Sequence, residues 1–289
     1  MKQKLIAVLI ANLFIAAPVF AQSDFSLNGS VSVGAINVGD KDAPDASKLN
    51  EFRDLSNGGL LGFDIAGRGS RYWMDLFGEN IGRDDHFVNL RGGMYDVFKY
   101  RLYTDQLKHN FLFGGRTPYA NAGSASIMAT LPSLNPALWN TIDIGYKRRD
   151  DGGFFEFQGA SPWYFRVDGN QVTQSGNKVG ASSQGMSPGN GQIDIAFPTE
   201  YTTRNATVEG GYSSKTMQFA VSWMTSKFEN DNKFVDWNNG FYLGQDRTYL
   251  EADNKYSRLA ANATIRKLPF NSTLALRFTD DELKSNTNL

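Results

Sequence analysis

The sequence contains no cysteine and only two histidines, His86 and His109. Without cysteine there is no disulfide, no thiolate nucleophile and no zinc site of the cysteine type. Covalent haem attachment is also excluded, because it requires a Cys-x-x-Cys-His motif. We therefore expect this chain to bind no metal and no cofactor of its own.

The sequence also lacks an excess of either charge. Its 29 basic and 30 acidic residues give a formal net charge of −1. A nucleic-acid partner calls for a strongly basic face, so we expect none.

The only long apolar run lies at the start of the chain. A basic beginning with Lys2 and Lys4 precedes a run that is apolar from Leu5 to Ala17 apart from Asn12, and small residues flank Phe20. This pattern predicts a secretory signal peptide over residues 1–21, with cleavage after Ala21. The alternative is an N-terminal anchor, but the run is shorter than the roughly 20 apolar residues of a spanning helix.

Residues 22–289 contain no further long apolar run, so the mature chain has no candidate spanning helix. They show instead a period of two: Met217, Phe219, Val221 and Trp223 alternate with more polar residues. Such alternation predicts strands with one apolar and one wet face. The same period recurs at residues 98–103, 142–149, 163–168, 258–266 and 273–279.

Alternation alone does not separate a soluble sandwich from a membrane barrel. Strands of about nine to eleven residues and short turns that alternate with long polar loops favour the barrel. Aromatic residues near the expected strand ends favour it too: Tyr72, Trp73, Tyr95, Tyr103, Trp163, Tyr212 and Trp223. We predict an all-β, antiparallel transmembrane β-barrel over residues 22–289, with roughly twelve strands in this chain.

The expected connections are of two kinds, and barrels place short turns in the periplasm and long loops outside. The predicted short turns are Arg149–Gly153, with its Asp-Gly hairpin signal, Ser213–Thr216 and Lys267–Asn271. The predicted long loops are Thr117–Asn140, Asn170–Arg204 and Glu229–Tyr256.

The end of the sequence, Asp280–Leu289, is polar and is predicted to be a loop or turn. Outer-membrane barrels generally finish on an amphipathic strand with a terminal aromatic residue. We therefore expect this sequence to be the N-terminal part of a larger barrel.

Few residues suggest chemistry in the wall itself. Asp84-Asp85-His86 could serve an outer-membrane hydrolase, but a polar turn between two strands explains them better. His109 is expected to be a polar strand residue rather than a ligand. Lys147-Arg148-Arg149 could hold an anion, yet a charged strand end near the membrane surface is the preferred interpretation. We predict no catalytic residue and no enzyme.

Glycine pairs superficially resemble phosphate-binding loops. Since none is expected to precede a helix, they are interpreted as turns, bulges or close backbone approaches. The pairs are Gly58-Gly59, Gly92-Gly93, Gly114-Gly115 and Gly210-Gly211.

Residues Glu51–Pro118 carry the most distinctive motifs. They include Leu55-Ser56-Asn57-Gly58, Gly62-Phe63-Asp64, Asp75-Leu76-Phe77-Gly78-Glu79-Asn80, Gly82-Arg83-Asp84-Asp85, Leu90-Arg91-Gly92-Gly93 and Phe98-Lys99-Tyr100-Arg101. This segment resembles the MtrB/PioB family of outer-membrane proteins associated with decahaem cytochromes. Some members carry a Cys-x-x-Cys pair near the mature N-terminus, which this sequence does not have.

The resemblance implies a barrel sheath in the bacterial outer membrane. Such a sheath holds a periplasmic decahaem c-type cytochrome and supports extracellular electron transfer.

The haem c belongs to that partner, and the predicted loop Asn170–Arg204 is the expected contact for an extracellular cytochrome. A closed twelve-strand barrel would have a radius of only about 12 Å. Two alternatives remain, a general diffusion porin for small polar solutes and an outer-membrane hydrolase.

Overall fold

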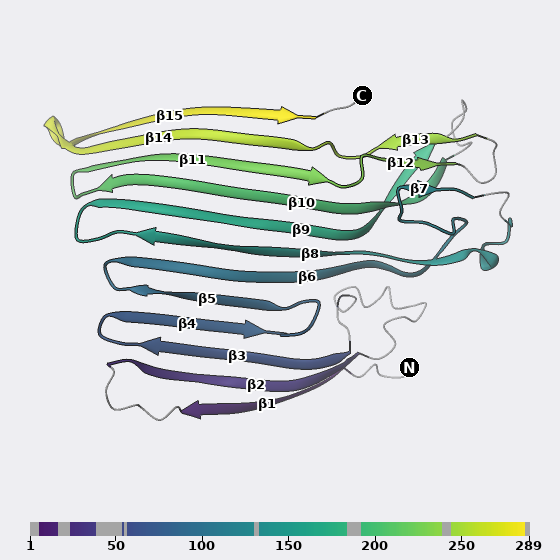
Figure 1. The fold of residues 1–289 in the computed structure, drawn as a ribbon, viewed down its shortest axis with the longest axis horizontal. Coiled ribbons are helices and arrows are strands. Elements are labelled where there is room, and N and C mark those ends of the chain that lie inside the picture. The colour runs from purple at the N-terminus through teal and green to yellow at the C-terminus, as the bar shows by residue number, and fades with distance from the viewer. Residues whose placement is uncertain are drawn as a thin grey trace.

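The computed structural model describes residues 6–16, 24–38, 54, 57–129, 133–183, 192–238 and 244–286. In this part of the chain, twelve strands form one large antiparallel sheet and three short strands form a second sheet (Figure 1). The two short helical turns described are η2 (Pro136–Leu138) and η3 (Pro269–Asn271). None of the described helices is long and apolar enough to span a bilayer.

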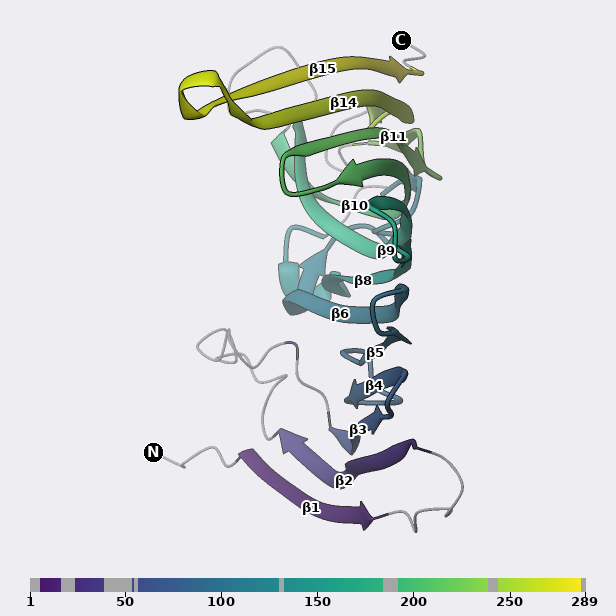
Figure 2. The ribbon, with the colours of Figure 1, turned by 90° about the vertical axis from the view of Figure 1, so that its left-hand side faces the viewer.

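The large sheet follows the order of the chain, and each strand pairs with the next long strand. Its strands are β1 (Ile6–Ala16), β2 (Ser26–Val38), β3 (Gly58–Arg68), β4 (Tyr72–Glu79), β5 (Phe87–Met94), β6 (Phe98–Thr117), β8 (Asn140–Phe157), β9 (Trp163–Ser183), β10 (Gln192–Ser213), β11 (Met217–Asn230), β14 (Asn254–Leu268) and β15 (Ser272–Ser285). The small sheet contains β7 (Ser126–Ile127), β12 (Phe234–Trp237) and β13 (Asp246–Tyr249). Figure 2 shows the large sheet as a single twisted layer, with β1 and β15 at its two edges.

This architecture confirms the predicted all-β, antiparallel class. Of the twelve strands described in the large sheet, β1 lies within the predicted signal peptide and eleven follow it, close to the predicted number. β1 pairs with β2 from Ile6 opposite Val38 to Ala16 opposite Asn28. Strand pairing does not test processing, so the signal peptide stays a prediction.

Short and long connections alternate along the sheet. Residues 69–71, 95–97, 158–162, 214–216 and 269–271 are the short ones, and they lie together at the left edge of Figure 1. The 80–86 turn and the longer segments, described at residues 118–129, 133–139, 231–238 and 244–253, lie at the opposite edge. The predicted turns at Ser213–Thr216 and Lys267–Asn271 are confirmed. At the first, the backbone N–H of Ser214 donates to the Met217 carbonyl at 2.8 Å.

The predicted turn at Arg149–Gly153 is wrong, because these residues lie inside β8. Asp151 pairs with Thr104 of β6 on one side and with Gln171 of β9 on the other. A hairpin of the Asp-Gly type needs positive φ angles, and neither Gly152 nor Gly153 adopts one. Gly153 instead allows a close approach, since a Cβ there would lie 2.4 Å from the Arg101 carbonyl oxygen.

The predicted loop Asn170–Arg204 is also wrong over its described residues, which belong to β9 and β10. Their pairing runs from Gln192 opposite Ser183 to Tyr212 opposite Trp163. These strands have 21 and 22 residues, longer than predicted. At about 3.3 Å per residue and a tilt of about 40°, they rise roughly 50 Å, twice the height of an apolar membrane band. The polar residues of β9 and β10 therefore form the parts of these strands that extend beyond the apolar membrane band.

The end of the described chain corrects a third expectation. Residues 280–285 continue β15, and Asp280 pairs with Leu259 while Ser285 pairs with Asn254. The apolar face of β15 ends at Phe278, and beyond it the residues of the strand are polar apart from Leu283. Backbone pairing continues there because it does not depend on apolar side chains. Residues 287–289 lie outside the described part.

Candidate functional site: a wall with two unlike faces

One face of the large sheet exposes apolar side chains to its surroundings. Adjacent strands contribute directly paired residues, such as Phe155 opposite Val167 and Phe157 opposite Phe165. A soluble sheet would bury such a continuous patch. The exposed members are Leu27, Val33, Leu61, Tyr72, Leu102, Phe155, Phe157, Trp163, Phe165, Val167, Val208, Met217, Val221, Trp223, Leu259, Leu274, Leu276 and Phe278. We call this the outer face.

Aromatic residues on the outer face gather in part at the short-turn end. Trp163 contacts Tyr212 and Phe219 with ring centroids 5.3 Å away in both cases. Rings at this level suit the membrane–water interface. Trp73 lies near the start of β4 as predicted, but Trp73 and Tyr103 alternate onto the opposite face and cannot belong to a lipid-facing girdle.

The opposite, inner face carries charges that pair across strands. Lys99, Glu156, Arg166 and Glu209 occupy one row from β6 to β10. The ammonium of Lys99 lies 2.8 Å from Glu156, and the guanidinium of Arg166 lies 3.5 Å from the other Glu156 oxygen. The Tyr164 hydroxyl donates to Glu209 at 2.8 Å. Charges of opposite sign therefore alternate along this row.

The same arrangement continues into β3, β4 and β5. Asp75 accepts from Arg68 at 2.5 Å and from Arg91 at 3.2 Å, so one carboxylate joins three strands. The guanidinium of Arg101 donates to the Asn89 side chain at 2.6 Å.

A hydrogen-bonded network around Asp150 lies on the inner face further from the short turns. The Asn170 amide donates to Asp150 at 2.7 Å, and the Asn205 amide donates to Asn170 at 2.9 Å. The Tyr103 hydroxyl donates to Asp150 at 3.3 Å. The inner face is thus hydrophilic but largely satisfied by its own hydrogen bonds and ion pairs.

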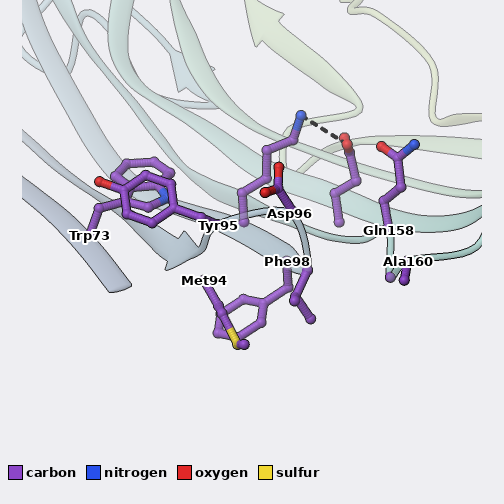
Figure 3. Close-up of a pocket in the computed structure, with 11 residues that line it drawn as sticks. Trp73, Met94, Tyr95, Asp96, Phe98, Gln158 and Ala160 are labelled. Atoms are coloured by element: carbon purple, nitrogen blue, oxygen red, sulfur yellow. Dashed lines mark ion pairs between the residues drawn. The ribbon is translucent and has the colours of Figure 1, made fainter. Parts of the chain in front are cut away.

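A recess of about 420 Å³ lies where the 95–97 and 158–162 turns meet. Trp73 and Tyr95 lie together on one side of it, Gln158 lies on the other side, and Asp96 lies between them (Figure 3). The dashed pair in the figure joins Lys99 and Glu156. The recess therefore joins the inner charged row to the short-turn edge of the wall.

The Asp84-Asp85-His86 motif forms part of the turn between β4 and β5, as expected. Asp84 lies 2.6 Å from the Lys147 ammonium, whose hydrogen bond holds the pKa of that carboxyl below its usual value. Asp85 pairs with Arg83 at 3.0 Å, and His86 Nδ1 lies 2.8 Å from the Arg83 carbonyl oxygen. These residues stabilise a turn. The described residues contain no group of three or more His, Asp or Glu side chains that could hold a metal.

His109 also has structural partners. Its Nδ1 lies 2.9 Å from Asp54, and its ring contacts Phe111 edge-on with centroids 4.6 Å apart. The predicted basic cluster lies inside β8, beyond the apolar band, with each cation near a carboxylate. Arg148 lies 3.8 Å from Asp150, and Arg149 lies 2.9 Å from Asp151.

The glycine pairs lie within strands and not in turns, and none precedes a helix. A Cβ on Gly93 would lie 2.2 Å from the Phe98 carbonyl oxygen, and one on Gly211 would lie 2.6 Å from that of Phe219. Gly114 has a φ of 62° where the β6–β8 register shifts. These positions permit close approach or a bulge.

The small sheet and the buried cluster around it were not predicted from the sequence. Ile195 and Phe197 of β10 belong to that cluster, although the surrounding sequence had been assigned to a polar loop. The signal available was the short alternation Ile193, Ile195 and Phe197.

Long antiparallel strands with an exposed apolar face and a self-paired polar face define the wall of an outer-membrane β-barrel. A sequence model of the family described as "Putative outer membrane beta-barrel porin, MtrB/PioB" matches residues 40–279, and the chain belongs to this family. It is similar to "Outer membrane protein MtrB" of Shewanella baltica (strain OS185), at 23% identity over 228 residues. The match covers 74% of this chain and 32% of that relative, so this chain spans about a third of the relative's length. The expected family is confirmed, and it is not an enzyme family.

Proposed function

We propose that this chain forms part of a barrel sheath that holds a periplasmic multihaem c-type cytochrome in the bacterial outer membrane. The observation that carries the proposal is the self-paired inner face. Lys99, Glu156 and Arg166 satisfy one another across three strands. A wall of this kind can enclose a folded protein without presenting isolated charges to it.

Electron transfer through a sheath needs no reactive group in the wall. The wall has to keep the partner's haems in place and exclude leakage of solutes around them. The chain contains no cysteine, so covalent haem c would be carried by the partner. Fixed polar side chains on the inner face would supply hydrogen bonds to that partner's surface.

The proposal requires a larger wall than the strands described. Eleven strands closed by themselves would have a radius of about 11 Å. A folded domain of about 100 residues already has a radius of gyration near 13 Å. The related MtrB protein is about three times as long as the region matched here, which is consistent with a wider barrel.

A general diffusion porin is the second candidate, favoured by the family's description as a porin. An open polar lumen would pass small solutes, whereas an occupied lumen would not. The two functions therefore differ in what fills the barrel.

Affinity purification of the full-length protein from its native membrane separates the two candidates. The sheath predicts co-purification of a protein with the Soret absorbance of haem. It also predicts that the purified complex conducts no ions across a planar bilayer. A haem-free preparation that conducts ions would reject the sheath and favour the porin.

A matched pair of variants tests whether the cytochrome partner contacts the charged row of the inner face. Arg166→Glu reverses a charge on the inner face, and Val167→Thr alters the neighbouring outer face. The first should reduce haem recovered per barrel, while the second should leave it unchanged. Equal recovery from both variants would argue against contact along this row.

A further inference from the structure

The most completely buried side chains lie at the long-loop end of the structure. Ile127, Val235 and Trp237 are 0% exposed, and Ile195 and Tyr119 are 1% exposed. Phe197 and Ala129 complete the cluster. The cluster joins the far end of β10 to the small sheet of β7, β12 and β13. This end therefore has a packed core of its own.

The core covers the inner face of β10 rather than its outer face. The β9–β10 register runs without a shift, so Ile195, Phe197 and Thr199 share a face with Asn205 and Glu209. At the same level, Val179 on the outer face of β9 remains 56% exposed. The small sheet thus lies on the lumen side of the wall.

Polar contacts fix the small sheet and its connections to that face. Glu251 forms an ion pair with Lys178 of β9 and accepts a hydrogen bond from the Tyr201 hydroxyl of β10 at 2.8 Å. Lys233 lies 2.5 Å from Asp253. The Glu251 contacts tie the segment after β13 to the wall. The Asp231 N–H donates to the Glu200 carbonyl of β10 at 3.0 Å and ties the segment before β12.

The segment 118–129 is tied to the same unit. The Asn238 amide donates to the Ala129 carbonyl at 2.6 Å, and Asn238 Oδ1 accepts from the Ala129 N–H at 2.8 Å. The Tyr119 hydroxyl donates to the Asn238 carbonyl at 2.5 Å. Two connections far apart in sequence therefore form one packed body.

We propose that this body, formed by the described residues 118–129, 231–238 and 244–253, is an inward-folded ledge that narrows the extracellular mouth of the barrel. Its own core and its ties to β9 and β10 keep it in place whether or not the lumen is filled. A ledge at this height restricts solute flow and limits how far a partner entering from the periplasm can advance. The inference rests on the barrel wall and not on the cytochrome sheath.

Excision of the β12–β13 hairpin tests the ledge. The Leu250 N–H donates to the Lys233 carbonyl at 3.0 Å, so the two ends of the hairpin are adjacent. Residues 234–249 can therefore be replaced by Asn-Gly, a two-residue turn that suits such a pair. The variant and the unaltered full-length barrel are reconstituted without partner, and conductance in potassium chloride and uptake of sugars of graded size are measured.

Conductance should rise at least about twofold and larger sugars should enter, since flow depends on the narrowest radius. Unchanged conductance with an unchanged sugar size limit would overturn the proposal. Folding is checked by heat-modifiable gel migration. Haem recovery with the native partner is measured separately, so failure of the sheath leaves this result standing and failure of the ledge leaves the sheath standing.

A matched pair of substitutions carries the test if the excised barrel does not fold. Lys178→Met removes a tie between ledge and wall, whereas Arg247→Met removes an ion pair of 2.7 Å to Asp236 within the hairpin itself. Lys178→Met should add frequent transitions to a higher-conductance level, and Arg247→Met should not. Identical current traces from the two variants would overturn the proposal.

Discussion

The Lys99 ammonium lies 2.8 Å from Glu156 Oε1, and these two residues are also direct partners in the register of β6 and β8. Strand register and charge pairing therefore coincide on the inner face. A shift of one residue would place Glu156 on the lipid side and leave Lys99 opposite an apolar residue. The charged row thus helps to specify the alignment of the wall.

Removal of one charge from this row should change ion preference. Glu156→Gln leaves Lys99 and Arg166 without their shared carboxylate, so the partner-free barrel should become more selective for anions. The free energy of unfolding should fall by about 1 kcal/mol, as expected for a partly exposed pair. Reversal potentials across a salt gradient report the selectivity. Lys99→Met is the matched control and should shift the reversal potential in the opposite direction; shifts of the same sign would contradict the prediction.

Two adjacent glycines should differ sharply in their tolerance of a methyl group. A Cβ on Gly211 would lie 2.6 Å from the Phe219 carbonyl oxygen, while one on Gly210 would have its nearest neighbour at 4.0 Å. Gly211→Ala should cost about 1–3 kcal/mol because strand separation must increase. Gly210→Ala should cost much less. The folded fraction in urea titrations of the full-length barrel distinguishes them, and equal losses would show that the close approach does not matter.

The Asp84–Lys147 pair should stabilise the wall in a pH-dependent manner. The hydrogen bond from Lys147 lowers the pKa of Asp84, so its contribution is present above the unfolded pKa near about 3.9 and is lost as the pH falls through the folded value. Asp84→Asn should therefore cost about 0.5 kcal/mol at neutral pH. Urea unfolding at neutral and strongly acidic pH checks this. A difference from the unaltered barrel that persists in strong acid would contradict the ionic origin.

The core of the ledge should unfold independently of the large sheet. Trp237 is fully buried and donates through its indole N–H to the Thr248 hydroxyl at 3.0 Å. Trp237→Ala removes most of that packing and should cost about 3–5 kcal/mol locally. Limited proteolysis from the extracellular side should then cut within residues 231–253 while the barrel keeps its heat-modifiable migration. Loss of that migration would show that the two units fold together.

Processing of the predicted signal peptide can be tested directly. Cleavage after Ala21 should give a mature protein that begins at Gln22, and Ala21→Arg should leave the precursor uncut because signal peptidase requires a small residue there. N-terminal sequencing of the exported protein provides the measurement. A mature protein that retains Met1 or begins elsewhere would refute the proposed site.

The sequence by itself predicted the two faces of the wall. The alternation of Met217, Phe219, Val221 and Trp223 is local, and a strand converts it directly into one apolar face. The turns at Ser213–Thr216 and Lys267–Asn271 were also predictable, because each separates two alternating segments. The place of Asp84 in a polar turn and of Gly93 and Gly211 at close backbone approaches was predictable for the same local reasons.

Predictions from local composition were wrong where pairing with distant strands determined the secondary structure. The Asp-Gly pair at Asp151 became part of β8 because β6 and β9 supply hydrogen-bonding partners on both sides. The polar residues of β9 and β10 remain extended for the same reason, since a ladder requires backbone groups and not apolar side chains.

The inner charged row and the ledge depend wholly on tertiary structure. Glu156 meets Lys99 and Arg166 only when three strands are aligned, and Trp237 meets Ile195 only when the segment after β11 folds back over β10. Periodicity in the sequence determined which side chains share a face. Register and long-range packing decided which of them touch, because those contacts join residues that local sequence does not relate.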